Sequence, residues 1–205
     1  MNEELNLINN IENKKIENLE QLPCADESKV ELLLASQGLK KATDFTFFEF
    51  EKVTEEVLKK TEEVFKEFGL FYIKNTRELT EIQRWKEYII GKNKEEVLLF
   101  QKLWNQDDDF GEEAKKKGEL LGFPKTAIDA YIKKETISRF DFPEEIKNKD
   151  FLAFGNIAFS KDNYKEELKT IEVWAEAIKR MDKDLYLRMV EEYKKDIEFY
   201  KNDKV

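Results

Sequence analysis

Histidine is absent from this chain of 205 residues, and cysteine occurs once. The absence of histidine removes the usual general base near neutral pH, the catalytic triads of hydrolases, the histidine-containing zinc sites and a histidine pH switch. Catalysis would therefore depend on carboxylates, lysine, tyrosine, Cys24 or a metal with oxygen ligands. We predict no catalytic residue set and no cofactor.

Disulfides, turn residues and long apolar runs are also scarce or missing. One cysteine cannot form an internal disulfide, and no apolar run approaches the roughly 20 residues that span a bilayer. The first residues, MNEELNLINNIENKK, open with acids and lack a basic start, an apolar stretch and a small-residue cleavage site, so we expect no secretory signal. Together these features predict a cytoplasmic protein without a membrane partner.

The composition favours helices. Glycine and proline number only 7 and 3, while 40% of the residues are hydrophobic and 16 are phenylalanine. Lysine and glutamate alternate at helical spacing, which is typical of solvated helix faces. We predict a predominantly helical α+β fold in which six to eight helices surround a small sheet of two or three strands. One domain over 1–205 is expected, with a possible subdivision into 1–75 and 76–205.

The two predicted strands lie near 45–50 and 70–74 and flank a helix over 52–68. In FTFFEF the aromatic side chains alternate between both faces, so Phe47 and Phe48 are both expected to be buried. If the two strands are adjacent, the connecting helix predicts that they run parallel. Truncating either phenylalanine is expected to cost about 3–5 kcal/mol.

From residue 76 onward the pattern predicts helices almost to the end of the chain. Thr76 begins a predicted helix that runs through Ile90 and ends at Gly91, and Asn93 caps the next one. Two short helices are expected around Gly122–Pro124. Two longer helices follow, from Ser160 or Asp162 and from about Asp182.

The acidic loop WNQDDDFGEE suggests a cation site, because calcium and magnesium prefer clustered carboxylates. The candidate ligands are Asp107, Asp108, Asp109, Glu112 and Glu113. The EF-hand register fails, since Phe110 occupies the glycine position and Lys116 the twelfth position. We therefore predict no metal site and no metal-induced rise in melting temperature, and interpret the loop as solvated acids that precede a helix.

Cys24 lies between Pro23 and a predicted helix N-terminus. The helix dipole at such a position lowers a thiol pKa, which would make the cysteine reactive. A free cysteine is also a small apolar side chain that packs well at a turn, and no histidine is present to activate it.

Residues 115–134, KKKGELLGFPKTAIDAYIKK, resemble the helix-turn-helix of bacterial repressors. Gly118 permits close approach of two helices, and Gly122, four residues on, can adopt a positive φ. Ile128 and Tyr131 occupy positions where the second helix packs on the first. The resemblance implies that the second helix enters the major groove of DNA and presents Lys125, Thr126, Lys133 and Lys134.

Three departures weigh against DNA binding. Lys117 occupies a position that is normally apolar, and the second helix has no Arg, Asn or Gln to read base edges. Residues 112–134 carry six lysines and four acids, hence +2, in a chain whose net charge is −9. Phosphate contacts dominate DNA affinity, so this charge supports only weak attraction and argues against nucleic acid as a partner.

Two short stretches, LLLASQGLKKA and GELLGFPKTAIDAY, are similar to a family of uncharacterised, largely archaeal proteins. That family is associated with a QG-K-A element and an LGYP-x-C-C segment, which correspond here to parts of 30–42 and 118–131. Thr126 and Ala127 stand where the family shows paired cysteines, so a thiol role is lost. The resemblance implies no activity.

The function predicted from these patterns is non-catalytic binding of a protein or a small ligand through an aromatic-lined surface. The alternatives are a helix-turn-helix nucleic-acid binder and, from a third class, a metal-assisted enzyme that uses the acidic loop 107–113.

Overall fold

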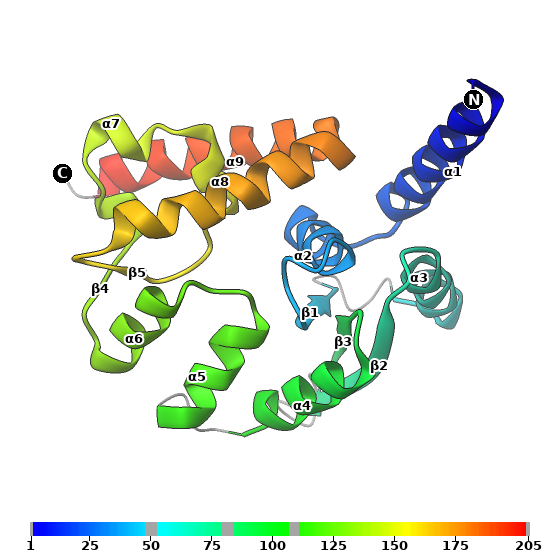
Figure 1. Cartoon of the computed structure of the whole chain (residues 1–205), viewed down its shortest axis with the longest axis horizontal. Coiled ribbons are helices and arrows are strands. Elements are labelled where there is room, and N and C mark those ends of the chain that lie inside the picture. The colour runs from blue at the N-terminus through cyan, green and yellow to red at the C-terminus, as the bar shows by residue number, and fades with distance from the viewer. Residues whose placement is uncertain (1, 48–52, 79–83, 107–110, 204–205) are drawn as a thin grey trace. The chain divides into compact units, whose positions relative to one another are not determined.

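The computed structural model describes residues 2–47, 53–78, 84–106 and 111–203 (Figure 1). The chain forms two compact units, Met1–Gln101 and Lys102–Val205, and each is described by itself. The predicted architecture is confirmed: the protein is α+β and predominantly helical, with a small antiparallel sheet of three strands and another of two. The single-domain organisation stays a prediction.

The first unit places helices around the three-stranded sheet. Its elements are α1 (Asn2–Glu20), α2 (Asp26–Ser36), β1 (Thr43–Thr46), α3 (Glu55–Glu67), β2 (Phe71–Glu78), β3 (Arg84–Gly91) and most of α4 (Lys94–Trp104). The last residues of α4, from Lys102 onward, belong to the second unit.

Local chemistry sets several of these helix ends. Thr54 caps α3 by accepting a hydrogen bond from the amide of Val57, and the Asn93 side chain accepts from the amides of Glu95 and Glu96 at the start of α4. Gly38 and Gly69 follow α2 and α3 with φ of +71° and +68°, a left-handed conformation that glycine adopts without strain. The cap at Asn93 was expected from the sequence. Ala25 precedes α2, without a side-chain capping hydrogen bond.

The sheet has the order β1-β3-β2, and both pairings are antiparallel. The predicted helix over 76–90 is therefore wrong, because residues 76–78 belong to β2 and residues 84–90 belong to β3. The error has a physical cause: the apolar residues of this segment fit helical spacing, yet a central strand is also apolar on both faces. β1 and β2 run in the same direction, but they are not adjacent, because β3 lies between them.

An aromatic cluster forms the core between α3 and one face of the sheet. Phe65 of α3 packs against Phe45 and Tyr88, with ring centroids 5.1 Å apart in both pairs. Phe47 is fully buried and contacts the ring of Phe45 edge-on at 5.5 Å. The prediction for Phe47 is confirmed, whereas Phe48 lies outside the described residues.

The second unit is built on a long helical hairpin. It comprises α5 (Gly111–Leu120), α6 (Lys125–Lys133), β4 (Thr136–Ile137), the 3-10 helix η2 (Arg139–Asp141), α7 (Glu144–Lys147), the 3-10 helix η3 (Asp150–Phe154), β5 (Phe159–Ser160), α8 (Tyr164–Met181) and α9 (Lys183–Asp203). The short helix α7 and the pair β4–β5 were not anticipated from the sequence.

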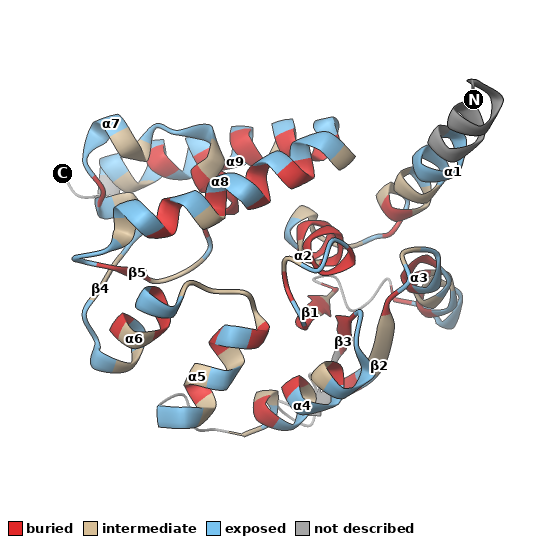
Figure 2. Cartoon of the chain, in the orientation of Figure 1, coloured by how far each residue is buried: buried red, intermediate tan, exposed pale blue. Residues whose placement is uncertain are grey.

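The hairpin of α8 and α9 follows the predicted pattern. Leu168, Ile171, Ala175 and Ile178 are buried on α8, and Figure 2 shows buried and exposed positions alternating along this helix. Asp182 precedes α9 and caps it, since its Oδ1 accepts a 2.9 Å hydrogen bond from the amide of Leu185. Within the described part of the chain, no helix is long and apolar enough to cross a membrane.

Candidate functional site

The corner between α5 and α6 has the close packing that its glycines predict. A Cβ atom added to Gly118 would lie 2.7 Å from Cγ1 of Ile128, so only glycine allows the two helices to approach this closely. Gly122 turns the chain with φ of +74°, and the amide of Phe123 donates a 2.9 Å hydrogen bond to the Gly118 carbonyl. Ile128 is buried in the corner as expected.

The residues predicted to face DNA are all exposed. Lys125 and Thr126 lie in the first turn of α6, and Lys133 and Lys134 lie at its end. The other side of α6 packs against β4, β5 and α8. Tyr131 departs from its predicted packing role, because 44% of its surface is exposed.

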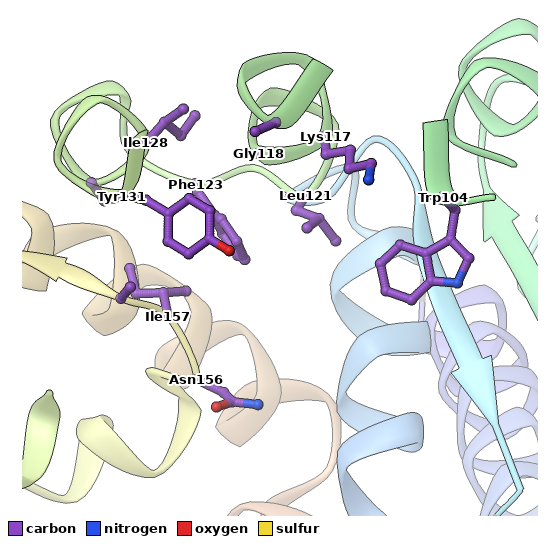
Figure 3. A pocket seen from close by; sticks show the side chains of 12 residues that line it. Trp104, Lys117, Gly118, Leu121, Phe123, Ile128, Tyr131, Asn156 and Ile157 are labelled. Carbon is purple, nitrogen blue, oxygen red and sulfur yellow. The ribbon is translucent and has the colours of Figure 1, made fainter. Parts of the chain in front are cut away.

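Tyr131 instead lines a pocket of about 340 Å³ beside this corner (Figure 3). The α5–α6 corner supplies most of the wall, and the rest comes from Trp104 at the end of α4 and from the segment between η3 and β5. In Figure 3, Phe123, Tyr131 and Ile157 gather on one side of the view, while Leu121, Lys117 and Trp104 lie on the other. The lining residues are Trp104, Ala114, Lys117, Gly118, Leu121, Phe123, Ala127, Ile128, Tyr131, Asn156, Ile157 and Ala158.

The polar groups of this pocket are few and well separated. They belong to Lys117, Tyr131 and Asn156, together with the indole of Trp104, whose nitrogen is directed away from Leu121 in Figure 3. The Lys117 ammonium donates a 3.3 Å hydrogen bond to the carbonyl oxygen of Gln106. Among the described lining residues, Lys117 alone carries a formal charge.

A second hollow of about 450 Å³ lies between η3 and α8 in the same unit, and its walls are charged. Asp150 there pairs with Lys194 at 2.9 Å, and Glu176 pairs with Lys179 at 3.7 Å. These ions already have partners at an open surface, where such pairs contribute little. We therefore take the apolar pocket as the candidate site.

The acidic loop contributes little to the described structure. Asp107, Asp108 and Asp109 lie outside the described residues. Glu112 is exposed, with one oxygen 4.0 Å from the Lys115 ammonium. No cluster of metal-ligating side chains occurs within the ranges that the structure describes.

Cys24 lies in the turn between α1 and α2. Burial raises the pKa of its thiol to about 12, and the opposing effect of the Lys29 ammonium is smaller. The thiolate is the nucleophilic form, so this environment favours an inert, packed cysteine.

Two polar clusters in the first unit involve carboxylates. Glu62 accepts hydrogen bonds from Lys74 at 2.7 Å, from Tyr72 at 2.9 Å and from Tyr88 at 3.1 Å. Desolvation acts to raise the pKa of Glu62, but these hydrogen bonds outweigh it and the pKa lies below its usual value. This carboxylate anchors the polar ends of tyrosines whose rings belong to the aromatic core.

The second cluster lies near the start of β1. Glu31 accepts hydrogen bonds of 2.6 Å from both the Lys40 ammonium and the Thr43 hydroxyl. Burial, followed by repulsion from Glu31, raises the pKa of Asp44 to about 6. We assign a structural role to this cluster, because its members bridge α2 and β1.

The sequence pointed to the α5–α6 corner but not to the pocket. Gly118, Phe123 and Ile128 are near one another in the sequence, whereas Asn156, Ile157 and Ala158 come some thirty residues later and reach the pocket only through the fold. The one local signal was Lys117, a lysine at a position where helix corners carry an apolar residue.

Comparison with known proteins identifies no relative of this chain. No family model, curated protein or solved structure matches this chain, so the resemblance to the archaeal family stays a prediction.

Proposed function

We propose that this chain is a non-catalytic binding protein whose second unit takes up a small, mainly apolar ligand in the pocket beside the α5–α6 corner. The pocket itself carries this proposal. Its volume of about 340 Å³ falls within the range of small-molecule sites, about 300–1,000 Å³. Such sites combine apolar walls with a few polar groups, as this one does.

The residue types in the wall support binding rather than catalysis. The described lining residues include no carboxylate, cysteine, serine or threonine. Leu121, Phe123 and Ile157 offer apolar surface, and Tyr131 and Asn156 offer hydrogen bonds that orient a ligand. Shape and apolar contact are therefore what the pocket supplies.

Titration with N-phenyl-1-naphthylamine tests the proposal, since this neutral probe fluoresces more strongly in apolar surroundings. We expect saturable binding at one site per chain. Ala158→Trp places an indole in the pocket, and we expect it to abolish the signal because the bulk of the side chain occupies the ligand's volume.

The matched control is Lys165→Trp, which adds the same indole at an exposed position of α8 outside the pocket. Binding to this variant is expected to equal that of the wild type. If the probe does not bind the wild type, or binds a folded Ala158→Trp protein as well as the wild type, the pocket is not a ligand site.

Nucleic-acid binding is the second candidate, and the exposure of Lys125, Thr126, Lys133 and Lys134 favours it. A helix of nine residues is only about 13 Å long, and much of α6 is occupied by packing within its own unit. We therefore rank it below ligand binding. The metal-assisted enzyme has no supporting observation in the described residues.

A further inference from the structure

The charge of the pocket defines its ligand more closely. Lys117 is the one formally charged side chain among the described residues that line it, and the remaining wall is mainly apolar. An apolar wall lowers the local dielectric constant, which strengthens the attraction between an ammonium group and an anion. A neutral hydrocarbon would gain nothing from a lysine here.

The position of Lys117 is also informative. Its neighbour Gly118 packs on Ile128 of α6, so Lys117 lies on α5 beside the tightest part of the corner. Its hydrogen bond to the Gln106 carbonyl holds the ammonium near the pocket. In Figure 3 the amino group is directed toward the space between Leu121 and Trp104.

We infer that the ligand is a small carboxylate with an aromatic or branched apolar body, and that Lys117 binds its carboxylate. The inference rests on the proposed function. The apolar body lies against Leu121, Phe123 and Ile157. A single lysine suits a single negative charge, whereas a phosphate or polyphosphate ligand requires several donors to satisfy its oxygens.

Isothermal titration calorimetry with two probes of nearly equal shape tests this inference. One probe is 1-naphthylacetate and the other is 2-(1-naphthyl)ethanol, which lacks the charge. We expect the wild-type protein to bind the carboxylate roughly tenfold or more tightly, as charge-assisted hydrogen bonds allow.

Variants of Lys117 test how the charge of this side chain contributes to ligand affinity, separately from its size. Lys117→Met keeps an apolar side chain of similar length, so we expect it to remove the preference and to leave the affinity for the alcohol unchanged. Lys117→Arg is expected to retain the preference. The control Lys116→Met removes a lysine from an exposed position that does not line the pocket, and is expected to have no effect.

The outcomes distinguish this inference from the function on which it rests. Equal affinities for the two probes, or a preference that persists in Lys117→Met, would show that the pocket binds apolar ligands without selecting a carboxylate. Failure of both probes to bind a wild-type protein that still binds N-phenyl-1-naphthylamine would also overturn the carboxylate assignment. Failure of all three would overturn both proposals.

Discussion

Individual side chains in this protein have ionisation properties that depend on burial more than on their place in the sequence. Cys24 follows a proline and precedes a helix, a position that favours a reactive thiol, yet burial raises its pKa to about 12. Asp44 likewise occupies a position in the sequence that suggests nothing unusual, although burial and repulsion from Glu31 raise its pKa to about 6.

The raised pKa of Asp44 predicts that stability falls as the pH rises. The folded protein holds the Asp44 proton up to about pH 6, whereas an unfolded chain loses it near pH 3.8, the ordinary pKa of an aspartate. The contribution of Asp44 to stability is therefore fully present below pH 3.8 and is lost as the pH rises to about 6.

Asp44→Asn, which mimics the protonated carboxyl group, is expected to stabilise the protein at pH 7 by about 3 kcal/mol and to have little effect at pH 4. Urea unfolding between pH 4 and pH 8 measures the difference. Asp184→Asn, at an exposed position of α9, serves as the control. Parallel profiles for Asp44→Asn and the wild type would contradict the prediction.

At the scale of elements, the ends of helices follow local sequence while the strands do not. Thr54, Gly69 and Asn93 mark helix boundaries through contacts within a few residues. β3 is a strand because β1 and β2 pair with it on both sides, a contact that its own sequence does not encode. Gly91, expected to end a helix, ends this strand instead.

Gly91 also allows a close approach that predicts a large effect of substitution. A Cβ atom at this position would lie 2.3 Å from the carbonyl oxygen of Lys41 and 2.9 Å from Cγ2 of Val97. The nearer of these atoms belongs to the backbone, so the backbone itself must shift to make room for the Cβ atom. We expect Gly91→Ala to destabilise the protein by about 3 kcal/mol in urea unfolding.

Gly38→Ala is the matched control for this prediction. Gly38 has a φ of +71° but no atom within 4 Å of an added Cβ. Its substitution is expected to lower the free energy of unfolding only through the left-handed backbone conformation, by about 1 kcal/mol. If Gly91→Ala lowers the stability no more than Gly38→Ala does, the prediction is wrong, and the backbone between β3 and α4 shifts without a large loss of stability.

At the scale of the whole molecule, charge is the property that separates the candidate functions. The net charge of −9 opposes binding to nucleic acid, and the net-positive segment 112–134 is both the α5–α6 corner and much of the pocket wall. Of the six lysines in this segment, Lys117 lines the pocket.

We predict no measurable binding to duplex DNA at physiological ionic strength with micromolar protein. Two or three phosphate contacts give a weak, salt-sensitive affinity, and α6 offers no Arg, Asn or Gln for base recognition. Fluorescence anisotropy with random-sequence DNA at about 50 and 150 mM salt measures this. A salt-sensitive signal that Lys125→Glu with Lys133→Glu abolishes in a folded protein would favour the helix-turn-helix alternative.

The sequence by itself determined the helix-rich α+β class, most helix boundaries, the burial of Phe47 and the glycine-dependent corner at Gly118 and Gly122. These features depend on periodicity, capping and backbone conformation, all of which act over a few residues. Only the tertiary structure decided that 84–91 is a strand and that Asn156–Ala158 completes a pocket with α5 and α6. Both depend on contacts between residues far apart in the chain, which local patterns do not record.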